Sequence, residues 1–246
     1  MVDGEASAAV HASRRAPEKA SEPTERPTAS PRQRWLVLAV VSGGLLLCGV
    51  DLTVLHVAVP SMSRDLRPGA AQLLWIVDVY SLALAALLVT CGTLGDRVGR
   101  RRMVLSGFFV FGLASAVCAF STSTAQLVAA RAALGAGAAM IMASTVAIIR
   151  VVFTDDRERA LAIGVWTSAH SVGATIGPLV GGVVTERWGW GAVFLVNVPV
   201  VVLLLAVGGP RRPGIEEPRS PPLGPGQRGP VRHRAGRRRV RAQTGR

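Results

Sequence analysis

Six long apolar stretches occupy the middle of the chain and constrain its fold more than any other feature. They cover residues 35–60, 72–94, 103–120, 127–149, 161–184 and 192–208. A helix needs about 20 residues to cross the hydrocarbon core of a bilayer, so stretches of this length predict transmembrane helices. Because backbone polar groups must find partners inside lipid, the sequence predicts an all-α membrane protein, a bundle of six helices.

Composition excludes several function classes. Half of the residues are apolar and the mean hydropathy is +0.39, in agreement with a membrane protein. The three cysteines all lie in apolar stretches, so we expect no disulfide framework and no metal site. With no nucleotide-binding loop in the sequence, we expect no cofactor and no enzyme, and an ion gradient as the energy source. The net charge is +13, but with one tyrosine and few other aromatic side chains there is little to stack on bases, which argues against nucleic-acid binding.

The arginines predict the orientation of the bundle. Basic residues gather in segments 1–34, 95–102, 150–160 and 209–246, whereas the other loops hold only Arg64, Arg67 and Arg187. Since basic loops stay on the cytoplasmic side, both termini are expected to be cytoplasmic, in a multi-pass protein of the cell membrane. Residues 1–34 and the Arg/Pro/Gly-rich residues 209–246 are both expected to be disordered tails. The second tail could also be the product of a shifted reading frame.

A glycine- and arginine-rich loop joins the second and third stretches. It reads Gly-Thr-Leu-Gly-Asp-Arg-Val-Gly-Arg-Arg-Arg from Gly92 to Arg102. Asp96 follows the C-terminal end of a helix, where the helix dipole is unfavourable for a carboxylate, so Asp96 needs a cationic partner or the N-terminus of another helix. The loop resembles the signature of the major facilitator superfamily at Gly92, Gly95, Asp96, Arg97, Gly99, Arg100 and Arg101. That resemblance implies a loop that holds the two halves of a transporter together on the cytoplasmic side.

Other segments resemble one branch of the same superfamily. Residues 49–60 resemble the first-helix signature of the fourteen-helix drug:proton antiporter branch, the EmrB/QacA type. Residues 74–85 resemble exporters of quaternary ammonium compounds, of the QacA and SmvA type. Residues 126–139 and 188–199 resemble the fourth helix and the start of the sixth. Together the resemblances cover residues 36–207 and end at about Gly208, which corresponds to the N-terminal half of such a transporter.

The fifth stretch carries glycines at helical spacing. Such glycines allow two helices to approach closely, and this structural role alone would explain their presence. The segment also resembles the antiporter motif of the family. In that motif a glycine-proline hinge, here Gly173, Gly177, Pro178, Gly181 and Gly182, seals the closed side by packing against the other half.

Three charged residues lie inside the apolar stretches: Asp51, Asp78 and Arg131. A charge at the bilayer centre costs at least about 2.5–3.5 kcal/mol, so such groups face a cavity or one another. They could form ion pairs that only lock the bundle. They could also form an exchange site, since burial raises the pKa of a carboxylate and a neighbouring arginine lowers it, which lets one carboxylate hold either a proton or an organic cation.

The resemblance implies roles for these residues. Asp51 matches a carboxylate that binds protons and cations, Asp78 an acidic position for cationic and often bivalent substrates, and Arg131 an arginine of proton coupling. Trp75 is either a cavity wall for cation–π contacts or an anchor at the membrane interface.

These features predict a proton-coupled multidrug efflux transporter of the major facilitator superfamily, reduced to its first half. Its expected partners are protons, cationic lipophilic small molecules, the lipid bilayer, and either a missing C-terminal half or a second copy of the chain. Two alternatives stay open: an inactive truncated or frameshifted fragment, and a non-transporting membrane adaptor that uses its basic tail.

Overall fold

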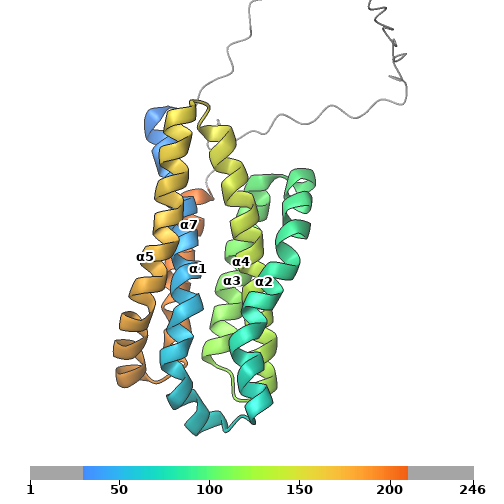
Figure 1. Cartoon of the computed structure of the whole chain (residues 1–246), viewed down its shortest axis with the longest axis vertical. Coiled ribbons are helices and arrows are strands. Elements are labelled where there is room, and N and C mark those ends of the chain that lie inside the picture. The colour runs from blue at the N-terminus through green and yellow to red at the C-terminus, as the bar shows by residue number, and fades with distance from the viewer. Residues whose placement is uncertain (1–29, 210–246) are drawn as a thin grey trace, which may run out of the picture. The chain divides into compact units, whose positions relative to one another are not determined.

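The computed structural model describes residues 30–209, which consist of helices and short connections (Figure 1). The long helices are α1 (Pro31–Leu66), α2 (Ala70–Val98), α3 (Arg100–Ala119), α4 (Thr124–Val152) and α5 (Asp156–Trp188). The single turn α6 (Ala192–Leu195) and helix α7 (Asn197–Gly208) follow. Residues 30–209 contain no strand, so the predicted all-α fold is confirmed. The predicted tails lie outside the described residues, except for residues 30–34 and Gly209.

The apolar stretches account for the helices. Each of the first five corresponds to one long helix, with Phe120 of the third stretch just beyond the end of α3, and α1 to α4 are long and apolar enough to cross a membrane. Helix α5 is comparably long, but serine, threonine and histidine side chains make it less apolar. The sixth stretch forms only the shorter apolar segment of α6 and α7.

The sixth stretch is not the single helix that the sequence predicts. It divides at Val196 into α6 and α7. Proline has no backbone N–H, so Pro199 cannot donate to the carbonyl of Leu195 four residues earlier. The break also puts Asn197 at the first position of α7, where its side chain points into the bundle and is fully buried.

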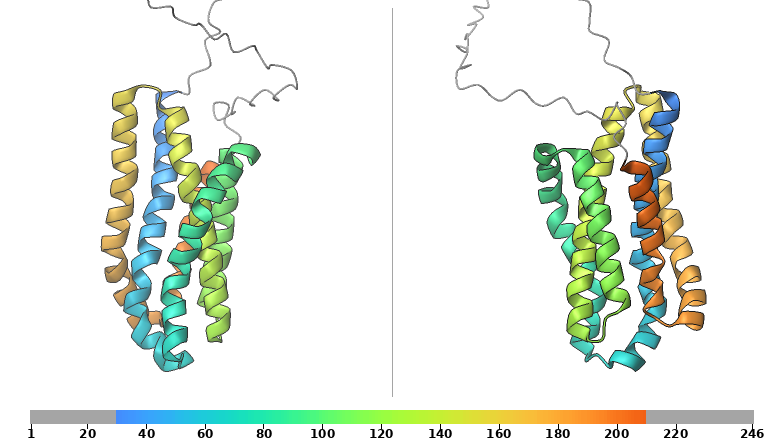
Figure 2. Two further views of the ribbon diagram at one scale, coloured as in Figure 1. Left: turned by 45° about the vertical axis from the view of Figure 1, so that its right-hand side comes forward. Right: turned by 180° about the vertical axis from the view of Figure 1, so that it is seen from behind.

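Consecutive long helices run in opposite directions, and the helices form two closely packed groups (Figures 1 and 2). In one group α1 lies along α5, and in the other α2 and α3 both pack on α4. Seen from behind in Figure 2, α7 lies between the groups and contacts α1 and α3. A continuous apolar core, which includes Phe108, Phe111 and Phe194, connects the groups.

Glycines permit the close contact between α1 and α5. A Cβ atom at Gly173 would overlap the carbonyl oxygen of Leu46, and one at Gly181 would lie 2.8 Å from a methyl group of Val54. Gly177 is also close to α1, since a Cβ atom there would overlap Oγ1 of Thr53 and lie 3.0 Å from the carbonyl oxygen of Val50. The expected role of these glycines in close helix packing therefore holds, and the helix that they contact is α1.

This contact gives a testable prediction. Gly177→Ala should destabilise the bundle by about 1–3 kcal/mol, because the added methyl group must push α5 away from the backbone of α1. Gly182→Ala is the matched control on the same helix, since its Cβ would meet nothing closer than 4.0 Å. Unfolding by a denaturing detergent measures both variants. Equal losses of stability in the two would contradict this account of the α1–α5 contact.

Candidate functional site

A buried ion pair lies at the centre of the bundle. Asp51 of α1 and Arg131 of α4 are 0% and 1% exposed, and Nη1 of Arg131 lies 2.7 Å from Oδ2 of Asp51. A charged group removed from water needs a partner of opposite charge and further hydrogen bonds. The pair therefore joins the two groups of helices at a point that neither solvent nor lipid reaches.

The second oxygen of Asp51 also has a partner. The side-chain amide of Asn197 in α7 donates to Oδ1 of Asp51 over 2.9 Å. The same amide nitrogen donates to Oγ of Ser115 in α3 over 2.8 Å. Asn197 and Ser115 are both fully buried. Each carboxylate oxygen of Asp51 therefore accepts from one buried donor, Oδ2 from Arg131 of α4 and Oδ1 from Asn197 of α7.

Helix α2 holds the other side of Arg131. Nε of the guanidinium group donates to the carbonyl of Ile76 over 3.3 Å, and the group lies 4.7 Å from the centre of the Tyr80 ring. Tyr80 in turn donates from its hydroxyl to the carbonyl of Cys48, over 3.5 Å. The network thus connects α1, α2, α3, α4 and α7, and Arg131 links Asp51 to the backbone of α2.

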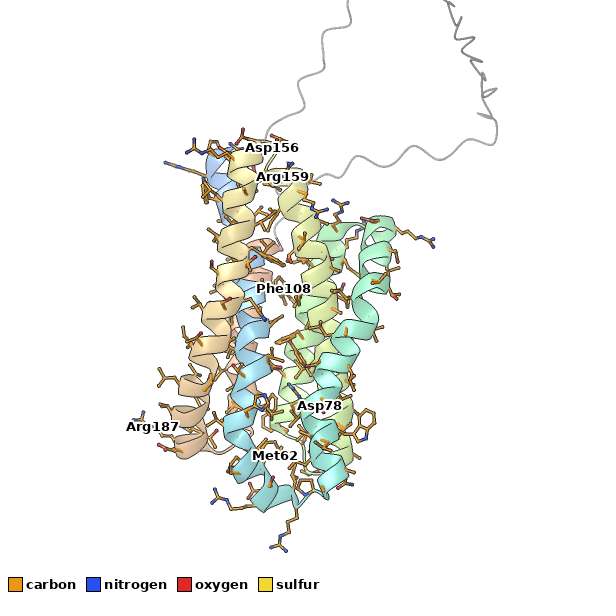
Figure 3. The ribbon with its side chains drawn as sticks, viewed as in Figure 1. Met62, Asp78, Phe108, Asp156, Arg159 and Arg187 are labelled. Atoms are coloured by element: carbon orange, nitrogen blue, oxygen red, sulfur yellow. The ribbon has the colours of Figure 1, made fainter. Side chains whose placement is uncertain are left out.

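Asp78 is separate from this network. Its side chain is exposed on α2, and within residues 30–209 it has no hydrogen bond or ion pair (Figure 3). Trp75 lies one turn earlier on the same helix and is 55% exposed. Residues three apart share a helix face, so Trp75 and Asp78 form an aromatic and acidic pair on the open side of α2. The structure therefore brings together two of the three predicted charges and leaves the third accessible.

The loop between α2 and α3 ties helix ends together. Nη2 of Arg100 lies 3.0 Å from Oδ1 of Asp96, which supplies the cationic partner that Asp96 needs at the end of α2. Arg100 also donates to the carbonyl of Ala147 in α4 over 3.0 Å. Arg101 donates to the carbonyls of Gly208 and Gly209 over 3.2 and 2.7 Å, so that it caps the end of α7.

The glycines of this loop have different environments. Gly99 has a φ of +104° between α2 and α3, a conformation that residues with a side chain rarely adopt. Gly95 is buried and lies close to Met103 and Ser144. Gly92 has open space around it. The side chain of Arg97, the remaining residue of the signature, is exposed.

Gly99 should therefore be the least replaceable glycine of the loop. Gly99→Ala is expected to cost about 1–3 kcal/mol, since alanine at this φ strains the backbone. Gly92→Ala serves as the control and should be neutral or stabilising by up to about 1 kcal/mol, because Gly92 is helical and unhindered. Thermal unfolding of the two variants in detergent tests the difference. A Gly92 variant at least as unstable as the Gly99 variant would contradict it.

The motif of α5 divides between two sides of the helix. Gly173, Gly177 and Gly181 are buried against α1, as described above. Pro178 is exposed and Gly182 half-buried. The resemblance implies packing of all five against the other half of a transporter, but three of them are already in contact with α1 of this bundle. Only Pro178 and Gly182 lie on the open side.

Comparison with known proteins identifies the family. Residues 41–242 match the Major Facilitator Superfamily, which is most of the chain. The chain belongs to this superfamily. As a superfamily member with several apolar helices, it is a multi-pass membrane protein, and the predicted family is confirmed. The partial coverage of the relatives given below is consistent with the predicted N-terminal half.

The similar curated proteins include an efflux pump and two resistance proteins. The chain is 50% identical to the multidrug efflux pump LfrA of Mycolicibacterium smegmatis over 204 residues, which are 83% of the chain and 40% of LfrA. It is 43% identical to the methyl viologen resistance protein SmvA of Salmonella typhimurium, over 71% of the chain and 35% of SmvA. It is 38% identical to the multidrug resistance protein Stp of Mycobacterium tuberculosis, over 71% of the chain and 32% of Stp. The chain spans two fifths or less of the length of these relatives.

Sequence reasoning missed three side chains of the buried network, those of Tyr80, Asn197 and Ser115. Asn197 lies in a segment whose resemblance to the sixth helix was evident, yet nothing assigned its side chain to Asp51. A signal was present, because a polar side chain within an apolar membrane segment marks a functional site by default. Ser115 gave no comparable signal, since serine often packs between membrane helices without further function.

Proposed function

We propose that this chain forms the N-terminal six-helix bundle of a proton-coupled exporter of cationic, lipophilic compounds. The observation that carries the proposal is the fully buried Asp51, paired with Arg131 and hydrogen-bonded to Asn197. The similarity to efflux pumps such as LfrA supports the direction and class of transport. In this proposal Asp51 binds the transported proton, and Arg131 responds to its binding.

The buried pair suits proton coupling because it has two stable charge states. When Asp51 is charged, it holds Nη1 of Arg131. A proton on Asp51 removes most of that attraction, which leaves Arg131 bound to Ile76 and Tyr80 of α2. Each proton bound or lost therefore changes the attraction between α1 and α4, which carry Asp51 and Arg131, and two packed arrangements of these helices can follow.

The substrate cation binds on the open face of α2 in this proposal. Both oxygens of Asp51 are occupied and enclosed, so an organic cation cannot contact them in this conformation. Asp78 offers an accessible carboxylate, and Trp75 beside it offers an aromatic face that attracts cations. Proton and cation are then coupled through α2, which carries Asp78 and also contacts Arg131.

A second bundle completes the pathway. Helices α2 and α5 each contribute only four buried residues, whereas α1 contributes fifteen. Their open faces carry large apolar side chains such as Val89 and Leu179, which need lipid or protein against them. We assign this position to a C-terminal half, or to a second copy of the chain. The N-terminus and the signature loop lie on the cytoplasmic side, where Asp96 remains largely exposed toward that bundle.

Ethidium accumulation in bacteria that lack their own major exporters tests this function. Cells would express the chain alone, or together with the part of LfrA that lies beyond the region of similarity. We expect lower ethidium accumulation in at least one of the two strains, and a return to the level of empty cells when a protonophore removes the gradient. Accumulation equal to that of empty cells in both strains, with the chain present in the membrane, would contradict the proposal.

The cation site gives its own prediction. Asp78→Asn should lower the affinity for a bisquaternary cation about tenfold, equivalent to about 1.4 kcal/mol, and that for monovalent ethidium less, because one carboxylate contact is lost. Asp65→Asn is the matched control, since Asp65 lies at the end of α1 and accepts a hydrogen bond from Trp190 over 2.9 Å. Quenching of tryptophan fluorescence by each cation gives the affinities. A larger loss in the Asp65 variant would contradict the assignment.

A further inference from the structure

Asn197 occupies an unusual position in the buried network. Both hydrogens of its amide nitrogen are used, one toward Oδ1 of Asp51 and one toward Oγ of Ser115. Its own carbonyl oxygen is buried and has no hydrogen-bond partner among residues 30–209. A buried acceptor without a partner destabilises a protein by about 1–3 kcal/mol, so something must favour this orientation.

The charge on Asp51 accounts for the orientation. If the amide turned over, its carbonyl oxygen would face the carboxylate oxygen of Asp51, and two acceptors would meet without a hydrogen between them. A hydrogen bond from an amide to a charged carboxylate is about twice as strong as one between neutral groups. The bond to Asp51 therefore outweighs the unpaired carbonyl of Asn197 only while Asp51 is charged.

From this geometry we propose that Asn197 is a positioning residue that sets the proton affinity of Asp51. Its amide holds Oδ1 while Arg131 holds Oδ2, so that the charged carboxylate is fixed from two sides. Because Asn197 begins α7, the proposal also connects the proton site to the last described helix. The inference rests on the proposed function only in taking Asp51 as the proton site.

Asp51 has few titratable neighbours besides its ionic partner. Among the described residues, the charged or titratable side chains that interact with it are Arg131 of α4, Tyr80 of α2, Cys48 of α1 and Cys118 of α3. Asn197 carries no charge, and its amide hydrogen bonds go to Asp51 and Ser115 rather than to any of these four. A change at Asn197 therefore acts on Asp51 directly.

Infrared titration of the whole chain in lipid vesicles tests the proposal. The band of the protonated Asp51 carboxyl group is identified by its loss in Asp51→Asn, and its midpoint is followed with pH. Asn197→Leu removes the donor to the charged form, so its midpoint should move to higher pH by about one to two units, a 10- to 100-fold rise in proton affinity. Asn197→Asp has nearly the same shape as the native residue but places a second carboxylate beside Asp51, and its shift should be larger still.

Two further variants separate positioning from a structural role. Ser42→Ala, at a buried position on α1 where the hydroxyl has no hydrogen-bond partner among the described residues, should leave the midpoint unchanged. Ser115→Ala removes the second anchor of the amide and should shift the midpoint in the same direction by less. Folded Asn197→Asp with the native midpoint would overturn the role of Asn197 alone. A native chain without any Asp51 band between about pH 4 and 10 would overturn both the proton site and this inference.

Discussion

Asp51→Asn is expected to abolish proton-driven export of ethidium by any exporter that contains this chain. Asparagine has almost the same shape as aspartate and can keep a hydrogen bond to Arg131, but it can neither bind a proton nor attract the guanidinium group as an ion. Ethidium accumulation in the variant should therefore equal that of cells without the exporter, while the amount of protein in the membrane stays the same.

Two comparisons sharpen this experiment. Asp78→Asn should reduce export of bivalent cations and leave proton-driven export of ethidium measurable, since Asp78 lies outside the buried network. Glu186→Gln, on the exposed end of α5, should behave as the native chain. Native efflux by the Asp51→Asn exporter would remove Asp51 from the mechanism.

Arg131→Met is expected to destabilise the bundle by about 3–5 kcal/mol. The substitution leaves Asp51 charged, buried and without its ionic partner, which costs more than the pair itself contributes. The double variant Asp51→Asn/Arg131→Met removes both charges and should recover most of the lost stability. Unfolding of the three chains by a denaturing detergent gives the free energies.

The double variant separates stability from function. It should be nearly as stable as the native chain and yet carry no proton-coupled export, because no carboxylate remains at the site to bind the proton. If the single Arg131 variant were no less stable than the double variant, Asp51 and Arg131 would not form the ion pair seen in the structure.

The positions of the helices could be predicted because lipid leaves little choice. An apolar stretch that crosses a bilayer must be helical, and glycine or charged residues lie near most helix ends. Pro60, where the first predicted stretch ends, lies instead inside α1, which continues to Leu66. Gly99, with its positive φ, ends one helix and starts the next as the loop pattern indicates. The division at Val196 was not predicted. The sixth stretch is apolar and long enough for one helix, so the hydrogen bond that Pro199 cannot make was not taken into account.

The composition of the site could be predicted only in part. The cost of charge in lipid selects Asp51, Asp78 and Arg131 from the sequence, but their partners depend on the rotation of each helix about its axis. That rotation follows from close contacts such as those of Gly135 with the backbone of Tyr80, which no periodicity reveals. For the same reason the sequence could not indicate which aspartate pairs with Arg131.

Proton release on substrate binding tests the central claim most directly. Ethidium is added to the purified exporter that contains this chain, in a weakly buffered solution with a pH indicator. The native exporter should release protons in proportion to the ethidium that it binds, and Asp51→Asn should bind ethidium without releasing any. Equal proton release by the two proteins would contradict the claim that one enclosed carboxylate on α1 couples the proton to the cation.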